Sequence, residues 1–246
     1  MTLLKPYLII IKSLLYFLFD SIALWKTSNP QKTPLEVILL IRQDAIGDFV
    51  IWLDTAKEYC KLYPPEKYRI VLVGNELWFD LAKELPFWDE VFPVEVKQFK
   101  TFSRYRWNLL RKVRNLGAQI AIQPTFSREF YHGDALIRAS GAVRKVSSAG
   151  DMSNRNRLKT FLANRWHTDL IPAFPEPLCE LERNTEFFSG LTGITLSINY
   201  PELEVLENGL LPELRKQAFY VLVPGASKDM KKWSTPSFLK IAEKIF

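Results

Sequence analysis

Short runs of β-branched apolar residues alternate with segments of helical length along most of this 246-residue chain. Three of these runs, at 37–41, 69–73 and 90–94, are typical of strands buried on both faces of a parallel sheet. Helices are predicted between them, at 49–63, before Pro64, and at 76–85, after Asn75 as a candidate N-cap. This order predicts an α/β fold with a doubly wound parallel sheet.

The alternation continues in the second half of the chain. We expect a helix at 102–116 with Gly117 after it, then a strand at 119–123. A helix at 133–140 and a strand at 143–147 complete the predicted series. The stretch 150–180 lacks a clear period and contains several prolines, which predicts irregular structure.

A second series begins near the end of the chain. Residues 219–223 predict a buried strand, 224–227 a tight turn, and Pro236 the first turn of a helix that runs to the terminus. One strand and one helix cannot close a hydrophobic core. The expected organisation is therefore a helix and linker at 1–30, a domain at 31–200, and a linker with the start of an incomplete domain at 201–246. We expect a truncated chain, or one that needs a partner.

The N-terminal segment 7–25 is almost continuously apolar, interrupted by Lys12, Ser13, Asp20 and Ser21. Central charges disfavour a spanning helix, and no small-residue cleavage site follows. We expect a helix that attaches the protein to a membrane surface, peripherally or as an N-terminal anchor. Whether it spans or lies on the bilayer is open, and a helix packed on the domain itself is the alternative.

The net charge of +6 indicates an anionic partner. Basic residues concentrate at 97–114 and at 138–165, which favours an anionic membrane or a phosphorylated acceptor over nucleic acid, while a solvated surface is the alternative. The chain has two cysteines, Cys60 and Cys179, and two histidines, in no metal-binding pattern. We expect no metal and a reducing, cytoplasmic environment.

Two motifs carry candidate chemistry. Residues 42–48, Arg-Gln-Asp-Ala-Ile-Gly-Asp, follow the first strand, at the sheet edge where ligands bind in open α/β folds. Gly47 allows close approach of a ligand, and Asp48 is either a reactive carboxylate or an N-cap. The second motif combines Gly225, Ala226, Ser227 and Lys231 after the strand at 219–223. Its amides, hydroxyl and ammonium suit a diphosphate, although a surface turn with solvated lysines is the alternative.

Together these motifs, about 175 residues apart, resemble the heptosyltransferase-like glycosyltransferases of glycosyltransferase family 9. The resemblance implies a GT-B architecture of two Rossmann-like domains and metal-independent, inverting transfer of a heptose-like sugar to a lipopolysaccharide-core or related cell-envelope acceptor. No cofactor is implied beyond the nucleotide-diphosphate sugar as co-substrate. The implied location is the cytoplasmic face of the inner membrane.

Residue roles follow from the same resemblance. It implies that Asp48 is the general base and that Gly225, Ala226, Ser227 and Lys231 bind the donor diphosphate. Candidate contacts to an anionic glycan or glycolipid acceptor are Gly47, Ser127, Arg128 and Asp134. The family's Asp-Thr-Gly and histidine motif is missing before Phe246. An inactive remnant or a membrane-associated binding module is therefore the alternative function.

Overall fold

The computed structural model describes residues 5–25, 34–202, 219–226 and 229–245. By its internal contacts the chain divides into two compact units, Met1–Glu202 and Leu203–Phe246. Each unit is described by itself below.

The first unit contains a six-stranded parallel sheet with the order β3-β2-β1-β4-β5-β6. Strand β1 is central, and the strand order reverses direction there, because β2 lies on one side of it and β4 on the other. This confirms the predicted doubly wound, Rossmann-like sheet. The strands are β1 (Glu36–Arg42), β2 (Tyr68–Asn75), β3 (Glu90–Val94), β4 (Ile120–Gln123), β5 (Arg144–Ser148) and β6 (Asp169–Ile171).

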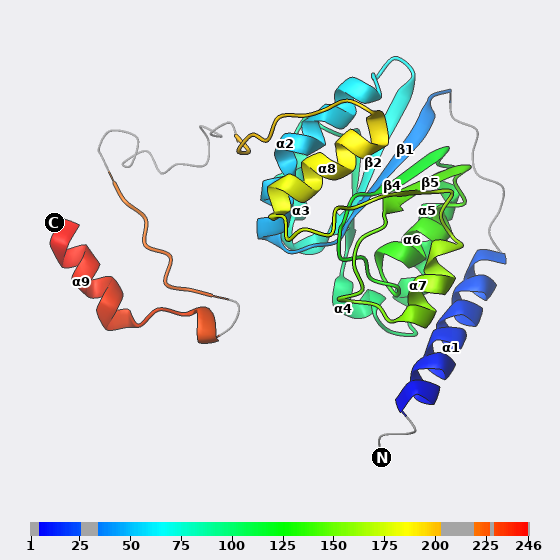
Figure 1. Ribbon diagram of the computed structural model, residues 1–246, viewed down its shortest axis with the longest axis horizontal. Helices are drawn as coiled ribbons and strands as arrows, with labels where there is room; N and C mark the ends of the chain where they lie inside the picture. Colours follow the sequence, from blue (N-terminus) through cyan, green and yellow to red (C-terminus); the bar gives the residue numbers. More distant parts are fainter. Residues whose placement is uncertain (1–4, 26–33, 203–218, 227–228, 246) are drawn as a thin grey trace. The chain divides into compact units, whose positions relative to one another are not determined.

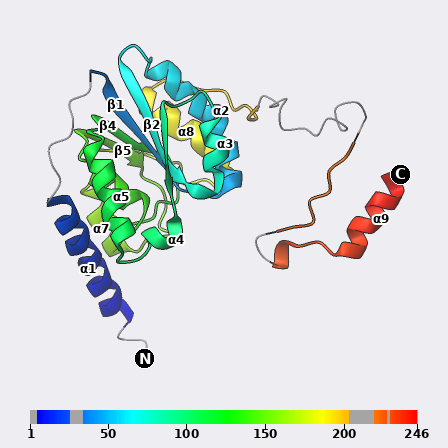
Figure 2. The ribbon, with the colours of Figure 1, turned by 180° about the vertical axis from the view of Figure 1, so that it is seen from behind.

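Helices cover both faces of this sheet (Figures 1 and 2). Helices α2 (Ile46–Leu62) and α8 (Glu180–Thr192) pack together on one face, beside α3 (Phe79–Lys83). Helices α5 (Arg104–Asn115) and α6 (Gly133–Ser140) pack together on the other face. The remaining described helices of this unit are α1 (Lys5–Trp25), η1 (Glu76–Trp78), α4 (Val96–Phe99) and α7 (Arg157–Asn164).

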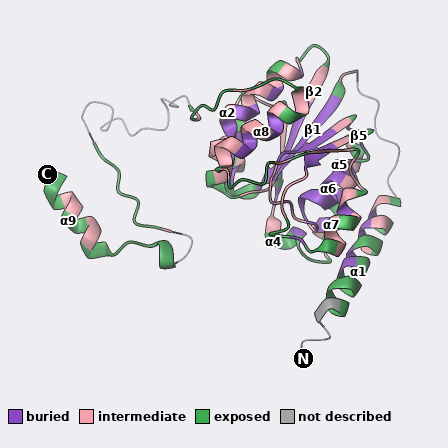
Figure 3. Cartoon of the chain, in the orientation of Figure 1, coloured by how far each residue is buried: buried purple, intermediate pink, exposed green. Residues whose placement is uncertain are grey.

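The side chains of β1 divide between two hydrophobic cores. Val37, Leu39 and Ile41 join the core under α5 and α6, whereas Ile38 and Leu40 join the core under α2 and α8. All five are fully buried, as the colouring of β1 in Figure 3 shows. A strand with helices on both faces must be apolar at every position, which is why this run has no polar alternation.

The prediction of irregular structure at 150–180 is wrong in part, because α7 and β6 lie within this range. Asn156 caps α7 by accepting a hydrogen bond from the amide of Lys159 at 2.9 Å. Strand β6 is a three-residue edge strand whose residues are only half-buried, so it carries no apolar run that a sequence pattern could detect. Helix α8 follows, with Glu182 bonded to the amide of Cys179 and Gly193 in the left-handed conformation at its end.

The second unit differs from the prediction at its start. Residues 219–223 form no strand among the described residues, and Val221 and Val223 are both more than 70% exposed. A strand needs a hydrogen-bonded neighbour, and the described residues of this unit supply none. The predicted helix is confirmed as α9 (Thr235–Ile245), with Pro236 in its first turn, and a short helix, η4 (Asp229–Lys231), precedes it.

Within the first unit, helix α1 packs on the sheet domain through α5. Its residues Ser13, Tyr16, Asp20 and Ala23 are buried there. The packing of this helix on the domain, an alternative in the sequence analysis, is therefore observed. Among the described residues, the stretch Tyr7–Trp25 is the one helix long and apolar enough to cross a membrane, and only 22% of it is buried.

Candidate active site

A small cavity of about 70 Å³ lies at the carboxyl ends of β1 and β4. This is the edge at which open α/β sheets bind their ligands. The volume admits a few water molecules or the hydroxyl-bearing edge of a sugar. Its lining is mostly polar and consists of Ile41, Gln43, Asp44, Gln123, Thr125, Ser127, Glu129, His132, Gly133 and Asn154.

Asp44 is the acidic group of the 42–48 loop that faces this cavity. Its Oδ2 accepts a hydrogen bond from the Thr125 hydroxyl at 3.2 Å and lies 3.0 Å from Nε of Arg42. Its backbone carbonyl accepts hydrogen bonds from Asn75 Nδ2 at 3.2 Å and Trp78 Nε1 at 3.1 Å. Contacts from β2, η1 and the loop after β4 thus hold the 42–48 loop against the sheet edge.

Arg42, the last residue of β1, is fully buried and connects the residues that follow it to α8. Nη1 donates to Asn184 Oδ1 at 2.8 Å, and Nη2 pairs with Glu180 Oε1 at 2.5 Å. Nη2 also donates to the backbone carbonyl of Asp48 at 3.4 Å. Burial raises the pKa of Glu180, Arg42 lowers it, and the nearby Asp44 and Asp48 raise it further. The buried guanidinium of Arg42 therefore contacts the carboxylates of Asp44 and Glu180 and the backbone carbonyl of Asp48.

Asp48 lies in the first turn of α2, and the N-cap of that helix is Ala45. The N-cap alternative for Asp48 is therefore wrong. Its side chain is half-buried, and its carboxylate has no hydrogen bond or ion pair within the described part of the chain. Beside it, Gly47 is exposed, and a Cβ built there would meet no atom within 4 Å. Asp48 does not line the cavity.

Glu129 and His132 form one part of the cavity wall. Nδ1 of His132 lies 2.9 Å from Oε2 of Glu129, and its Nε2 is buried without a hydrogen-bond partner among the described residues. Gly133 follows, and a Cβ there would lie 2.0 Å from Nε2 of Gln123, so any larger residue would displace the Gln123 side chain from the cavity lining. Asp44 belongs to the 42–48 motif, but no role at the site was predicted for it from the sequence. Glu129 and His132 were not identified, because no motif spacing connects their loop with residues 42–48.

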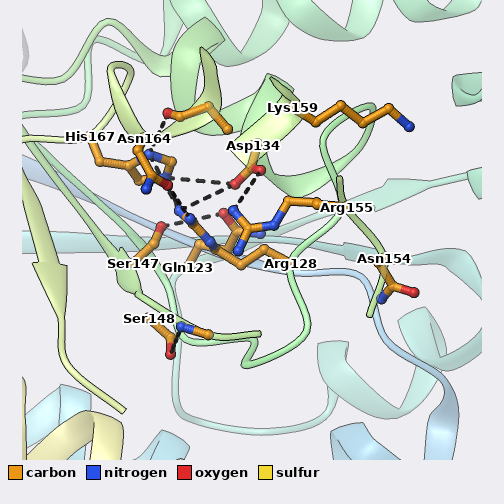
Figure 4. Close-up of polar contacts among 12 residues, drawn as sticks. Gln123, Arg128, Asp134, Ser147, Ser148, Asn154, Arg155, Lys159, Asn164 and His167 are labelled. Atoms are coloured by element: carbon orange, nitrogen blue, oxygen red, sulfur yellow. Dashed lines mark hydrogen bonds and ion pairs between the residues drawn. The ribbon is translucent and has the colours of Figure 1, made fainter. Parts of the chain in front are cut away.

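The acceptor candidates Arg128 and Asp134 lie inside the domain rather than at its surface. Both side chains are fully buried, and their nearest charged atoms are 3.5 Å apart. Arg155 approaches Asp134 to 3.6 Å, and Arg128 donates to Asn164 Oδ1 at 2.6 Å (Figure 4). Ser127, the third candidate, does line the cavity, and its carbonyl accepts a hydrogen bond from Asn154 Nδ2 at 2.8 Å. The buried cluster therefore supports the two loops that carry Ser127 and Asn154.

His167 completes this cluster as a neutral side chain. Its Nδ1 bonds to the Ala163 carbonyl at 2.9 Å, and its Nε2 lies 3.1 Å from Nη1 of Arg128. Burial, assisted by the positive charge of Arg128, lowers the pKa of His167 from 6.5 to about 3. The proton therefore sits on Nδ1, and Nε2 accepts from the arginine.

The lowered pKa of His167 predicts a loss of stability in mild acid. Below pH 6.5 the unfolded chain binds a proton that the folded chain rejects until about pH 3, so stability falls as pH falls through this range. We expect a decrease of roughly 2 kcal/mol between pH 6.5 and 5, measured by urea unfolding. His167→Gln should reduce this decrease. His132→Gln, which removes the chain's other histidine, should retain it, and equal slopes in both variants would contradict the prediction.

The donor-side candidates lie in the second unit. Gly225 is exposed with open space beside it, and Ala226 is half-buried. Lys231 is exposed at the end of η4. Ser227 lies outside the described residues. Among the described residues, no three His, Cys, Asp or Glu side chains lie close enough to hold a metal ion.

Comparison with known proteins identifies the fold. No protein-family model and no curated protein matches the sequence. Solved structures do match, among them Escherichia coli heptosyltransferase WaaC with ADP-2-deoxy-2-fluoro heptose, at 14% identity and a TM-score of 0.61. That match covers 85% of this chain and 65% of WaaC. A glycosyltransferase family 9 protein from Veillonella parvula matches at 15% identity and a TM-score of 0.61, over 88% of this chain and 62% of that one.

These matches confirm the predicted resemblance at the level of fold. WaaC with ADP matches equally well, at 14% identity and a TM-score of 0.62, over 85% of this chain and 64% of WaaC. The chain thus spans slightly less than two thirds of the length of each of these structures. Identities of 14–15% show a shared architecture and leave substrates to be argued from the site.

Proposed function

We propose that this chain forms the acceptor-side part of an inverting, metal-independent glycosyltransferase. The donor would be a nucleotide-diphosphate sugar of the heptose type, and the acceptor a lipopolysaccharide-core or related glycan at the cytoplasmic face of the inner membrane. The main support for this proposal is Asp48, whose carboxylate has no partner among the described residues. It lies at the ligand-binding edge of the sheet, next to Gly47, which has open space beside it. The fold shared with WaaC, solved with ADP and with an ADP-heptose analogue, supports the donor class.

In this proposal Asp48 takes the proton of the acceptor hydroxyl as the reaction proceeds. The hydroxyl oxygen attacks the anomeric carbon on the face opposite the diphosphate, and the bond between that carbon and the diphosphate oxygen breaks. Configuration is inverted, and negative charge develops on the leaving diphosphate. Amides at Ala226 and Ser227, the Ser227 hydroxyl and the Lys231 ammonium would stabilise that charge.

The cavity beside the loop would orient the acceptor. Asp44, Thr125 and His132 offer hydrogen-bonding groups in its lining. Hydrogen bonds from acceptor hydroxyls to these groups would place the reacting hydroxyl near Asp48. Arg42 would act as a positioning residue, because it contacts both the Asp44 carboxylate and the Asp48 carbonyl.

A transfer assay tests the proposal. The protein as encoded, with any residues that follow Phe246, is incubated with ADP-heptose and a core oligosaccharide. We expect acceptor-dependent release of ADP that persists in EDTA, with inverted configuration at the new bond by NMR. Retained configuration would contradict the assignment of Asp48. Glycan binding without ADP release would favour the alternative, a binding module.

Lys231 and Lys232 provide a matched pair for the donor site. Lys232 pairs with Asp229 at 2.8 Å, whereas Lys231 has no ion-pair partner among the described residues. We expect Lys231→Ala to raise KM for the nucleotide sugar about five- to tenfold, because it removes a charge contact to the diphosphate. Lys232→Ala should change it less than twofold. An equal loss of donor and acceptor affinity in Lys231→Ala would contradict a diphosphate role.

A further inference from the structure

Helix α1 buries polar side chains against the domain and exposes apolar ones, the reverse of the usual arrangement for a helix on a globular domain. Its polar residues Ser13 and Asp20 face the domain and are buried. The opposite stripe is exposed and consists of Leu8, Ile11, Leu15, Leu18 and Ile22, each at least 48% accessible. Figure 3 shows this exposed outer side of α1. The exposed residues are spaced by three and four, and the buried residues Ser13, Tyr16, Asp20 and Ala23 have the same spacing, so the two sets run along opposite sides of one helix.

Polar contacts hold the inner stripe on the domain. Asp20 forms a two-pronged ion pair with Arg106, with Oδ1 2.7 Å from Nε and Oδ2 2.6 Å from Nη2. Ser13 Oγ lies 3.1 Å from the Tyr131 hydroxyl, and the Tyr16 hydroxyl donates to the Lys100 carbonyl. Arg138 donates to the Phe17 carbonyl at 3.2 Å. A helix bound this way cannot turn its apolar stripe inward without losing a buried ion pair.

Cations and aromatic rings lie next to α1. Lys12 and Lys159 both lie over the Tyr131 ring, with their Nζ atoms at 5.4 and 4.6 Å from its centroid. On another side, α1 and α5 border a groove of about 510 Å³ that contains Phe19, Phe102, Trp107 and the exposed Arg104. Apolar groups beside positive charges match the interface of a bilayer with anionic headgroups.

We propose that α1 lies in the plane of an anionic lipid bilayer, with its apolar stripe among the acyl chains and its polar stripe fastened to the domain. Lys12, Lys159 and Arg104 then contact the headgroups. A spanning orientation conflicts with the Asp20–Arg106 pair, because α1 would have to leave α5 to cross the bilayer. Membrane binding through α1 requires only these contacts and would occur whether or not the protein transfers a sugar.

Vesicle flotation tests the proposal. We expect the protein to float with vesicles containing 30% phosphatidylglycerol and to bind those of phosphatidylcholine alone at least tenfold more weakly. Leu15→Glu with Leu18→Glu should weaken binding at least 100-fold with an unchanged Tm, because both side chains are exposed. Leu77→Glu, the same change at an exposed leucine on η1, is the matched control and should bind as before. Lys12→Gln should weaken anionic binding about fivefold.

Two further measurements distinguish in-plane binding from a membrane-spanning α1 and from a dimer formed through α1. A Thr2→Cys variant that also carries Cys60→Ser and Cys179→Ser should react with a membrane-impermeant maleimide added outside the vesicles. Protection of that cysteine would overturn the in-plane orientation in favour of a spanning helix. A lipid-independent dimer that Leu15→Glu with Leu18→Glu dissociates would overturn the proposal in favour of a second copy. Asp48→Asn should bind vesicles normally, which separates this test from that of catalysis.

Discussion

Replacing Asp48 with asparagine is expected to lower kcat for sugar transfer by about 10²- to 10⁴-fold. Asparagine preserves the size of the side chain but cannot accept the proton of the acceptor hydroxyl. Asp48 makes no side-chain hydrogen bond or ion pair within the described residues, so the substitution removes no visible support of the fold. We therefore expect an unchanged Tm and an acceptor KM within about threefold of the original.

Asp54→Asn is the control for that measurement. Asp54 lies on the same helix, where it pairs with Lys57 and does not line the cavity. It should retain transfer within about twofold, because Asp54 lies outside the cavity and has no proposed contact with either substrate. If Asp48→Asn transferred sugar at the original rate, the base would have to be sought elsewhere. Asp44, four residues earlier and facing the cavity, would then be the next residue to replace.

Replacing Arg106 with methionine is expected to lower the free energy of unfolding by about 3–5 kcal/mol. Arg106 and Asp20 are both buried, and the guanidinium also donates to the carbonyls of Phe99 at 2.9 Å and Tyr131 at 2.7 Å. Removing the arginine leaves the Asp20 carboxylate buried without its counter-charge and leaves two carbonyls without a donor. Urea unfolding followed by circular dichroism measures the loss.

Two further variants test whether the loss of stability in Arg106→Met comes from the buried ion pair. Arg104→Met, two residues earlier on the same helix but exposed, should change the free energy of unfolding by no more than about 0.5 kcal/mol. Adding Asp20→Leu to Arg106→Met should recover much of the loss, because it removes the unpaired buried charge. Equal losses in Arg104→Met and Arg106→Met, or no recovery in the double variant, would contradict a buried ion pair between α1 and α5.

Most of the first unit was predictable because local pattern and tertiary environment agree there. Residues 37–41 are apolar at every position, and a central parallel strand is the element that buries both sides of such a run. Ser103 begins a helix because its hydroxyl accepts a hydrogen bond from the Arg106 amide, and Gly141 ends one because glycine readily adopts the left-handed conformation. These preferences act within a few residues, so they can be read from sequence order alone.

Prediction failed where an element depends on distant partners. Residues 219–223 are aromatic or aliphatic at every position, and 37–41 are aliphatic at every position. Residues 219–223 nevertheless form no strand among the described residues, because the described part of this unit offers no strand to pair with them. Conversely, β6 is only three residues long, too short for a sequence pattern to detect, and is a strand because β5 offers it an edge. Arg128 and Asp134 carry the charges expected of ligand-binding residues, but each is buried against the other.

The sequence alone determined the α/β alternation, the motif at 42–48 and the apolar character of 7–25, because each depends on residues close together in the chain. The tertiary structure decided which groups meet. It separated Asp48 from Asp44, placed Glu129 and His132 at the cavity, and turned the apolar stripe of α1 outward. These outcomes depend on contacts between residues such as Asp20 and Arg106, which are 86 positions apart, and on the desolvation of charges that only packing brings together.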